Sequence, residues 1–181
     1  LDPCNASSVI VDPNSGEVLA CVTYPGYDNN KLANSVDATY YAALTGDLSY
    51  PLLNYATQQK TAPGSTFKPL TATAALTEGL INAGEKIKDL GVFDKVALSP
   101  KCWIYPSSTH GSINVSQAIR DSCNYFFYEC GYRMATSKGS YNDDTGLDIL
   151  AEYAEMYGLS TTTGIEIPES EPEISDTDAV R

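Results

Sequence analysis

The sequence predicts an α+β fold, with a β-hairpin near its N-terminal end and mainly helices after it. Two β-rich runs, residues 8–11 and 17–23, flank the segment Asp12–Gly16, whose Asp, Pro, Asn and Gly are typical of a hairpin turn. Further along, apolar residues recur at helical spacing and stop at glycines such as Gly79 and Gly158. With 181 residues, 43% of them hydrophobic, the chain is long enough to bury a core.

The expected elements follow one another simply along the chain. The hairpin covers residues 8–24, and a connecting region of weak helical tendency covers 25–60. A mainly helical subdomain is expected over 61–170. The last residues, 171–181, are expected to fray because this end is acidic and contains proline. The helices of the subdomain are expected at about 65–78, 114–121, 123–135 and 147–157.

The charge of the chain excludes two classes of partner. The net charge is −12 and the isoelectric point is about 4.3. Such a surface repels nucleic acid and anionic headgroups, so we expect neither as a partner. No stretch approaches the roughly 18 apolar residues that a membrane span needs.

The cysteines and the histidine show no spacing typical of a metal site. The five cysteines contain no C-x-x-C pair. Cys123 and Cys130 are seven residues apart, so we expect them on one helix face as small packed groups. His110 is the only histidine, which argues against a histidine-based metal cluster and against a Ser-His-Asp triad. We therefore expect no metal and no cofactor, while the odd number of cysteines leaves the disulfide state open.

A serine and a lysine three residues apart form the first candidate catalytic pair. Ser65 and Lys68 lie in the heptapeptide Pro63–Pro69, at a predicted helix start. Residues three apart share a helix face, so the amine is expected to reach the hydroxyl and act as its base. Gly64 allows a sharp turn before the serine. The pattern is S-x-x-K, the first motif of penicillin-binding proteins and serine β-lactamases; the alternative is an amphipathic helix with a surface lysine.

A second motif, S-x-N, occurs three times. The three pairs are Ser112/Asn114, Ser122/Asn124 and Ser140/Asn142. The middle pair lies at the junction of two predicted helices, where the serine side chain is also able to cap the second helix. The first pair precedes a helix and the third lies in a polar stretch that resembles a loop. We therefore assign Ser122 as a catalytic residue and Asn124 as a substrate-binding residue.

Taken together, the chain resembles the transpeptidase domain of a class B penicillin-binding protein over about residues 8–170. Several segments carry the resemblance in the order and spacing of the family: Val11–Ala20, Tyr24–Asp28, Pro51–Ala56, Pro63–Pro69, His110-Gly111, Ser122-Cys123-Asn124 and Thr163–Pro168. The family often has His-Gly at this place, and we interpret His110 as a structural residue.

The third motif of the family, K-T-G or K-S-G, is absent from these 181 residues. In the family it lies on a strand well beyond the segment that Thr163–Pro168 resembles. We therefore expect the chain, 1–181, to be an incomplete domain, cut by design, by proteolysis or naturally. The implied fold is a partial penicillin-binding-protein or serine β-lactamase-like fold that lacks the C-terminal strands of its sheet.

The missing strands lead to an expectation about the hairpin. A lone two-stranded ribbon is marginally stable, and an unpaired strand edge is prone to pairing with another chain. We expect the hairpin either to pack on the helices and pair with the edge of another copy, or to be poorly ordered.

The resemblance implies a serine-type D-Ala-D-Ala transpeptidase. Such an enzyme cross-links peptidoglycan stem peptides through an acyl-enzyme on Ser65 and is acylated by penicillin and other β-lactams. Lys68 is the implied base, Ser122 relays the proton to the leaving group, and Asn124 holds the substrate amide. The oxyanion hole uses the Ser65 backbone N–H and a donor on the missing strand, so the fragment is expected to be nearly inactive.

The resemblance also implies a setting for the parent protein. It places the domain on the extracytoplasmic face of a bacterial cell membrane, with an anchor outside this chain and the cell-wall synthesis machinery as a partner. Two alternatives stay open: a β-lactam-sensing receptor domain and a non-catalytic scaffold. The role in elongation, division or sporulation, the acceptor amine and the sensitivity to β-lactams are not indicated by the sequence.

Overall fold

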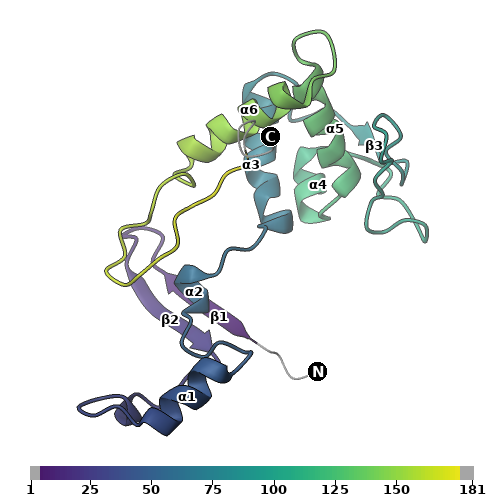
Figure 1. Ribbon diagram of the computed structural model, residues 1–181. Coiled ribbons are helices and arrows are strands. Elements are labelled where there is room, and N and C mark those ends of the chain that lie inside the picture. Colours follow the sequence, from purple (N-terminus) through teal and green to yellow (C-terminus); the bar gives the residue numbers. More distant parts are fainter. Residues whose placement is uncertain (1–4, 176–181) are drawn as a thin grey trace. The chain divides into compact units, whose positions relative to one another are not determined.

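The computed structural model describes residues 5–175, which form two compact units (Figure 1). Within the described residues, the first unit comprises 5–61 and 162–171, and the second comprises 62–161 and 172–175. The order of elements is a hairpin, three short helices, a 3-10 turn that leads into a longer helix, a small second ladder, and then three more helices. This agrees with the α+β fold that the sequence predicts.

The first unit is built on the expected hairpin. Strand β1 (Ala6–Val11) pairs antiparallel with β2 (Val18–Tyr24), and the register shifts between Ile10 and Val11. The turn closes as its residue types predict, since the Asp12 carboxylate accepts a hydrogen bond from the Asn14 N–H at 2.8 Å. The apolar side chains of this ribbon stay largely exposed, as for Ile10 (55%).

The connecting region contains three short helices, η1 (Asn29–Lys31), α1 (Ala38–Gly46) and α2 (Tyr55–Gln58). Helix α2 contacts both strands, and the Tyr55 N–H donates to Thr23 Oγ1 at 2.9 Å. The hairpin therefore packs on α2 within its own unit.

The segment 162–171 folds with the hairpin unit, whereas the sequence analysis placed it in the helical subdomain. Hydrogen bonds to the α2 region account for this. Thr57 Oγ1 donates to the Pro168 carbonyl at 2.8 Å, and Ser170 Oγ donates to the Gln58 carbonyl at 2.6 Å.

The second unit contains the helices that carry the candidate site. They are the 3-10 turn η2 (Gly64–Phe67), α3 (Lys68–Thr77), α4 (Val115–Arg120), α5 (Asn124–Thr136) and α6 (Asp143–Met156). Helix α5 contacts α3, α4 and α6 (Figure 1). A two-residue ladder of β3 (Ile87–Lys88) and β4 (Ser112–Ile113) lies before α4 in the chain. The fully buried side chains at the core include Phe93, Phe126 and Met134.

The expected helix ends are largely confirmed. Gly79 and Gly158 follow α3 and α6 with φ of 66° and 75°, the left-handed conformation that suits glycine after a helix. Helix α6 begins four residues earlier than expected, because Asn142 caps it by accepting from the Asp144 N–H at 3.0 Å. Of the tail expected to fray, residues 176–181 lie outside the described residues, and Ile174 packs against the helical core.

Candidate active site

Ser65 and Lys68 lie at the start of the first long helix of the second unit. Ser65 is in η2, and Lys68 is the first residue of α3. Gly64 has φ of 59°, so the turn into the helix uses a conformation that favours glycine. Pro69 falls in the first turn of α3, where its missing N–H costs no helical hydrogen bond. The serine is exposed and the lysine is half-buried.

Ser122 and Asn124 lie at the start of α5. Ser122 has φ of 52°, a left-handed backbone that costs a non-glycine residue about 1–2 kcal/mol. The residue at the helix N-cap is Cys123, and its side chain makes no capping hydrogen bond. The interpretation of Ser122 as a helix cap is therefore wrong. Its hydroxyl instead lies 3.0 Å from Ser65 Oγ.

The four predicted residues come together around the lysine amine. Lys68 Nζ donates to the Ser122 carbonyl at 2.8 Å, to Ser122 Oγ at 2.9 Å and to Asn124 Oδ1 at 2.6 Å. Among the hydrogen bonds of residues 5–175, none joins Lys68 Nζ directly to Ser65 Oγ. The expected direct contact is thus replaced by a chain in which the Ser122 hydroxyl links the amine to Ser65.

Burial of the amine disfavours its charged form. Burial lowers the pKa of Lys68 below the ordinary value of 10.5, because the charged form loses solvation. The thiols of Cys123 and Cys102 oppose this shift only in part. The amine also lies 5.6 Å from the centre of the Phe127 ring, on the apolar side of the site. A lysine with a lowered pKa is suited to accept a proton.

The other two S-x-N pairs have structural roles. Asn114 caps α4 in a capping box, in which its side chain accepts from the Gln117 N–H and Gln117 bonds back to Asn114. Asn142 caps α6, as described above. These asparagines are engaged in holding helix ends.

The residue after Ser122, Cys123, belongs to a cluster of polar groups in the interior. The other members are Asp89, Cys102 and His110. The Asp89 carboxylate accepts from the His110 N–H at 3.0 Å, lies 2.8 Å from His110 Nδ1, and accepts from the Gly91 N–H at 2.8 Å. Burial by itself would raise the pKa of Asp89, but these hydrogen bonds outweigh it, so the pKa lies below the usual value. His110 is thus held structurally, and its Nε2 is buried without a partner among the described residues.

The same cluster has the ligand types of a metal site. One ligand atom from each of its four residues lies within 4.8 Å of the others. Two thiols, an imidazole and a carboxylate are ligands that zinc takes. The single histidine argues against a histidine-based cluster, and here two cysteines and a carboxylate accompany it. No local spacing in the sequence indicates this cluster, because its successive residues are 8 to 13 positions apart in the chain.

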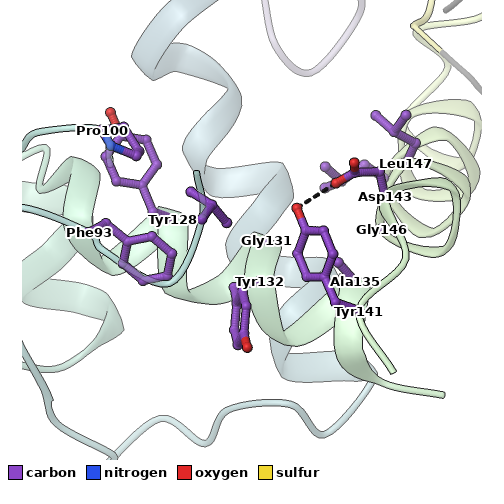
Figure 2. Close-up of a pocket in the computed structure, with 12 residues that line it drawn as sticks. Phe93, Pro100, Tyr128, Gly131, Tyr132, Ala135, Tyr141, Asp143, Gly146 and Leu147 are labelled. Atoms are coloured by element: carbon purple, nitrogen blue, oxygen red, sulfur yellow. Dashed lines mark hydrogen bonds between the residues drawn. The ribbon is translucent and has the colours of Figure 1, made fainter. Parts of the chain in front are cut away.

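A hollow of about 490 Å³ on the same unit contains none of the four catalytic candidates. Figure 2 shows its aromatic lining, including Phe93, Tyr128 and Tyr132, and the hydrogen bond from Tyr141 to Asp143. Small residues on the facing helices, Gly131 and Ala135 on α5 and Gly146 on α6, line the rest of the wall. Its lining includes no serine, threonine, cysteine or lysine.

The family model of the penicillin-binding protein transpeptidase domain matches residues 6–179 of the chain. The chain belongs to this transpeptidase family. The resemblance to class B penicillin-binding proteins is therefore confirmed.

Relatives of this transpeptidase segment include a peptidoglycan transpeptidase and a penicillin-binding protein. The peptidoglycan D,D-transpeptidase MrdA of Escherichia coli is 33% identical over 164 residues, which cover 91% of this chain and 24% of the relative. Penicillin-binding protein A of Mycobacterium tuberculosis, solved as a penicillin G acyl-enzyme complex, matches with a TM-score of 0.74 and 28% identity. That match covers 98% of this chain and 40% of that chain.

A third match is penicillin-binding protein PBP2 of Helicobacter pylori, solved in a complex with MreC. It has a TM-score of 0.82 and 23% identity, and covers 94% of this chain and 30% of that chain. The transpeptidase segment therefore spans about a quarter to two fifths of these proteins, and it has part of their fold. Within residues 5–175, none of the helices has the length and apolar character needed to cross a membrane.

Proposed function

We propose that this chain carries the nucleophile and the proton-transfer groups of a serine-type peptidoglycan D,D-transpeptidase. The substrates would be the stem peptides of the cell wall, and penicillin would acylate the same serine. The family membership and the D,D-transpeptidase relatives support the reaction class. The acyl-enzyme of the M. tuberculosis relative supports a covalent intermediate.

The observation that carries this proposal is the pair of consecutive hydrogen bonds that connects Lys68 Nζ, Ser122 Oγ and Ser65 Oγ, with separations of 2.9 and 3.0 Å. A hydroxyl is a weak nucleophile until a base removes its proton. Here the base acts through a second hydroxyl, which is close enough to both atoms for proton transfer.

For the first step we propose the neutral state of Lys68, in which the two consecutive hydrogen bonds reverse their direction. With Lys68 neutral, two of its N–H groups donate to the Ser122 carbonyl and Asn124 Oδ1, and its lone pair accepts the Ser122 hydroxyl proton. The Ser122 oxygen then accepts the proton of Ser65. As Ser65 Oγ attacks the substrate carbonyl, one proton moves from Ser65 to Ser122 and another from Ser122 to Lys68, which becomes an ammonium.

The same groups complete the acyl transfer. The ammonium returns a proton through Ser122 to the departing amine of D-alanine, or to the ring nitrogen that a β-lactam releases. The Ser65 ester is then attacked by an amine of a second stem peptide. Lys68 takes the proton of that amine through Ser122, and a proton returns along the same path to the Ser65 oxygen as it leaves. Asn124 holds Lys68 in place through Oδ1, and we assign its amide to the substrate.

The 181 residues supply one oxyanion donor, the Ser65 backbone N–H, and contain no K-T-G or K-S-G segment. Loss of one oxyanion donor typically costs about 10²–10³ in rate. We therefore propose that the 181-residue chain by itself is nearly inactive. The working enzyme would act on the extracytoplasmic face of the membrane with cell-wall synthesis proteins as partners, as the complex of the H. pylori relative with MreC suggests.

The test is covalent labelling with fluorescent penicillin, followed by mass spectrometry of the intact product of the gene. We expect one adduct, placed on Ser65 by peptide mapping and absent in the variant Ser65→Ala. Ser140→Ala is the matched control, because it removes an S-x-N serine that lies in a loop. An adduct that persists after Ser65→Ala would refute the assignment of the nucleophile.

A further inference from the structure

The aromatic hollow of the second unit is lined by residues of α5, of α6 and of the loop that carries Phe93 (Figure 2). Its volume of about 490 Å³ lies in the range of about 300–1,000 Å³ that is typical of ligand sites. All three segments belong to one compact unit, and none of the four catalytic candidates is part of the lining. The hollow is therefore a candidate binding site separate from the catalytic groups.

The rings of the hollow are held in place by one another. Phe93 is 1% exposed, and the centre of its ring lies 6.0 Å from the ring centres of both Tyr128 and Tyr132. The ring centre of Tyr132 lies in turn 5.6 Å from that of Tyr141. Because the rings already pack against each other, a ligand would not have to order them on binding.

The charge of the lining is negative. Among the described residues that line the hollow, Asp143 alone has a charged side chain. The Tyr141 hydroxyl donates to Asp143 Oδ1 at 2.5 Å, which holds the carboxylate beside the rings (Figure 2). The faces of aromatic rings are themselves negative and attract cations. The carboxylate and the rings thus favour the same kind of ligand, an organic cation.

A contact of this kind already exists within the chain. Lys95 Nζ lies 5.1 Å from the centre of the Tyr132 ring. That ammonium is paired with Glu129 at 2.7 Å, so its charge is balanced within the chain. Lys95 is not among the described residues that line the hollow, so it does not fill the space beside Asp143.

Gly131, in the middle of α5, leaves room in the wall of the hollow. Its φ is not in the left-handed region, and a Cβ added there would meet no described atom within 4 Å. Neither the backbone conformation nor close packing therefore requires glycine here, although glycine destabilises a helix interior relative to alanine. What the glycine provides is free space in the hollow.

From these observations we propose that the hollow binds an arginine side chain from an exposed segment of a partner protein. The guanidinium would stack on the tyrosine rings and pair with Asp143, and its aliphatic stem would lie against Leu147 and Leu150. Arginine suits this lining better than lysine, because its planar group stacks on rings as well as pairing with a carboxylate. The net charge of −12 would attract such a partner. The inference does not rest on the proposed transpeptidase function.

The experiment is a titration followed by saturation-transfer difference NMR on the intact product of the gene. The probe is the capped peptide acetyl-Gly-Leu-Arg-Leu-Gly-amide, and its control has citrulline, which has nearly the shape of arginine but no charge, in the central position. We expect saturable binding of the arginine peptide, with the strongest saturation on the methylene protons of arginine. The citrulline peptide should bind about tenfold more weakly, because it lacks the charge that the rings and the carboxylate attract.

Variants of the chain locate the site. Asp143→Asn should weaken binding of the arginine peptide about tenfold, through loss of the charge-assisted contact. Asp148→Asn is the matched control: this residue is exposed on the same helix, is not among the described lining residues, and its replacement changes the net charge equally. Gly131→Leu should abolish saturable binding by filling the hollow, and circular dichroism and urea unfolding check that the variants fold.

Several results would overturn the proposal. One is the absence of saturable binding by the arginine peptide, and another is equal binding of the arginine and citrulline peptides, which would indicate a purely apolar site. Equal weakening by Asp143→Asn and Asp148→Asn would show attraction by the net charge alone. Binding that survives both Asp143→Asn and Gly131→Leu would place the peptide elsewhere on the protein.

Discussion

The amine of Lys68 lies 2.9 Å from Ser122 Oγ, and that oxygen lies 3.0 Å from Ser65 Oγ. Two consecutive hydrogen bonds therefore connect the three groups, with the serine of the second motif between the other two. In the proposed mechanism, Ser122 takes part both in removal of the Ser65 proton and in donation to the leaving group.

Replacement of the central hydroxyl tests this arrangement. Ser122→Ala should slow acylation by penicillin about 10²–10⁴-fold, the usual range for general acid–base catalysis. Stopped-flow measurement of the acylation rate on the intact gene product checks it. Ser140→Ala should keep the full rate; an unchanged rate in Ser122→Ala would show that Lys68 reaches Ser65 by another path.

The acylation rate should depend on pH through Lys68. In the proposed mechanism the neutral amine is the base, and burial lowers its pKa below the ordinary 10.5. The rate should therefore rise with pH and level off at a pH lower than an ordinary lysine would give. The midpoint of the rate–pH profile gives this pKa, and a midpoint at or above 10.5 would contradict the role of burial.

Arginine at position 68 provides a sharper form of the same test. A guanidinium stays charged at any accessible pH, so Lys68→Arg should lose about 10²–10⁴ in rate and the rise with pH. Lys138→Arg, in the loop before α6, is the matched control and should keep both the acylation rate and its rise with pH.

The loop that carries Cys102 depends on Gly91. This glycine has φ of 83°, and a Cβ there would lie 2.3 Å from Tyr105 Cδ2. Gly91→Ala should therefore lower the free energy of unfolding by about 2 kcal/mol more than Gly139→Ala, through overpacking. Gly139 also has a positive φ, of 102°, but nothing within 4 Å of its added Cβ. Urea unfolding measures the free energy of unfolding of both variants. Equal losses of stability would show that the clash with Tyr105 is relieved.

Alkaline pH should weaken the helical unit through Cys130. Burial raises the pKa of this thiol to about 12, from an ordinary value of 9.0. Between these values the unfolded thiol ionises and the folded one does not, so the free energy of unfolding falls as pH rises. The slope from this group is about 1.4 kcal/mol per pH unit. Urea unfolding from pH 8 upward should show a shallower fall in Cys130→Ala, and no such change in Cys21→Ala.

The exposed hairpin should promote self-association. Ile10 and Leu19 are 55% and 61% exposed, and each strand has only one partner in the described structure. Ile10→Lys should weaken association roughly tenfold by adding charge at a strand edge. Leu98→Lys, which is 93% exposed on the helical unit, is the control. Sedimentation velocity at several concentrations checks this; a native chain that stays monomeric at high concentration would contradict it.

Much of this architecture follows from local sequence signals. The turn Asp12–Gly16 predicted the hairpin, glycines predicted the ends of α3 and α6, and the heptapeptide around Ser65 predicted a helix start. These features depend on backbone preferences within a few residues, which a sequence displays directly.

Other features depend on contacts that no local pattern reveals. The placement of Ser122 between Lys68 and Ser65 needs α3 and the turn before α5 to meet in space. The cluster of Asp89, Cys102, His110 and Cys123 gathers residues that are successively 8 to 13 positions apart in the chain. The true start of α6 was missed because Asn142 was interpreted as part of a loop, although asparagine is a good helix cap.

The left-handed backbone of Ser122 has a consequence for the assignment of S-x-N motifs. Of the three S-x-N matches in the chain, only the serine of this one has a positive φ among the described residues, and the asparagines of the other two close helix ends. Within this chain, that torsion angle separates the pair assigned to the site from the other two matches, which the letters S-x-N alone do not. The same angle can be compared in structures of other proteins before an S-x-N match is assigned.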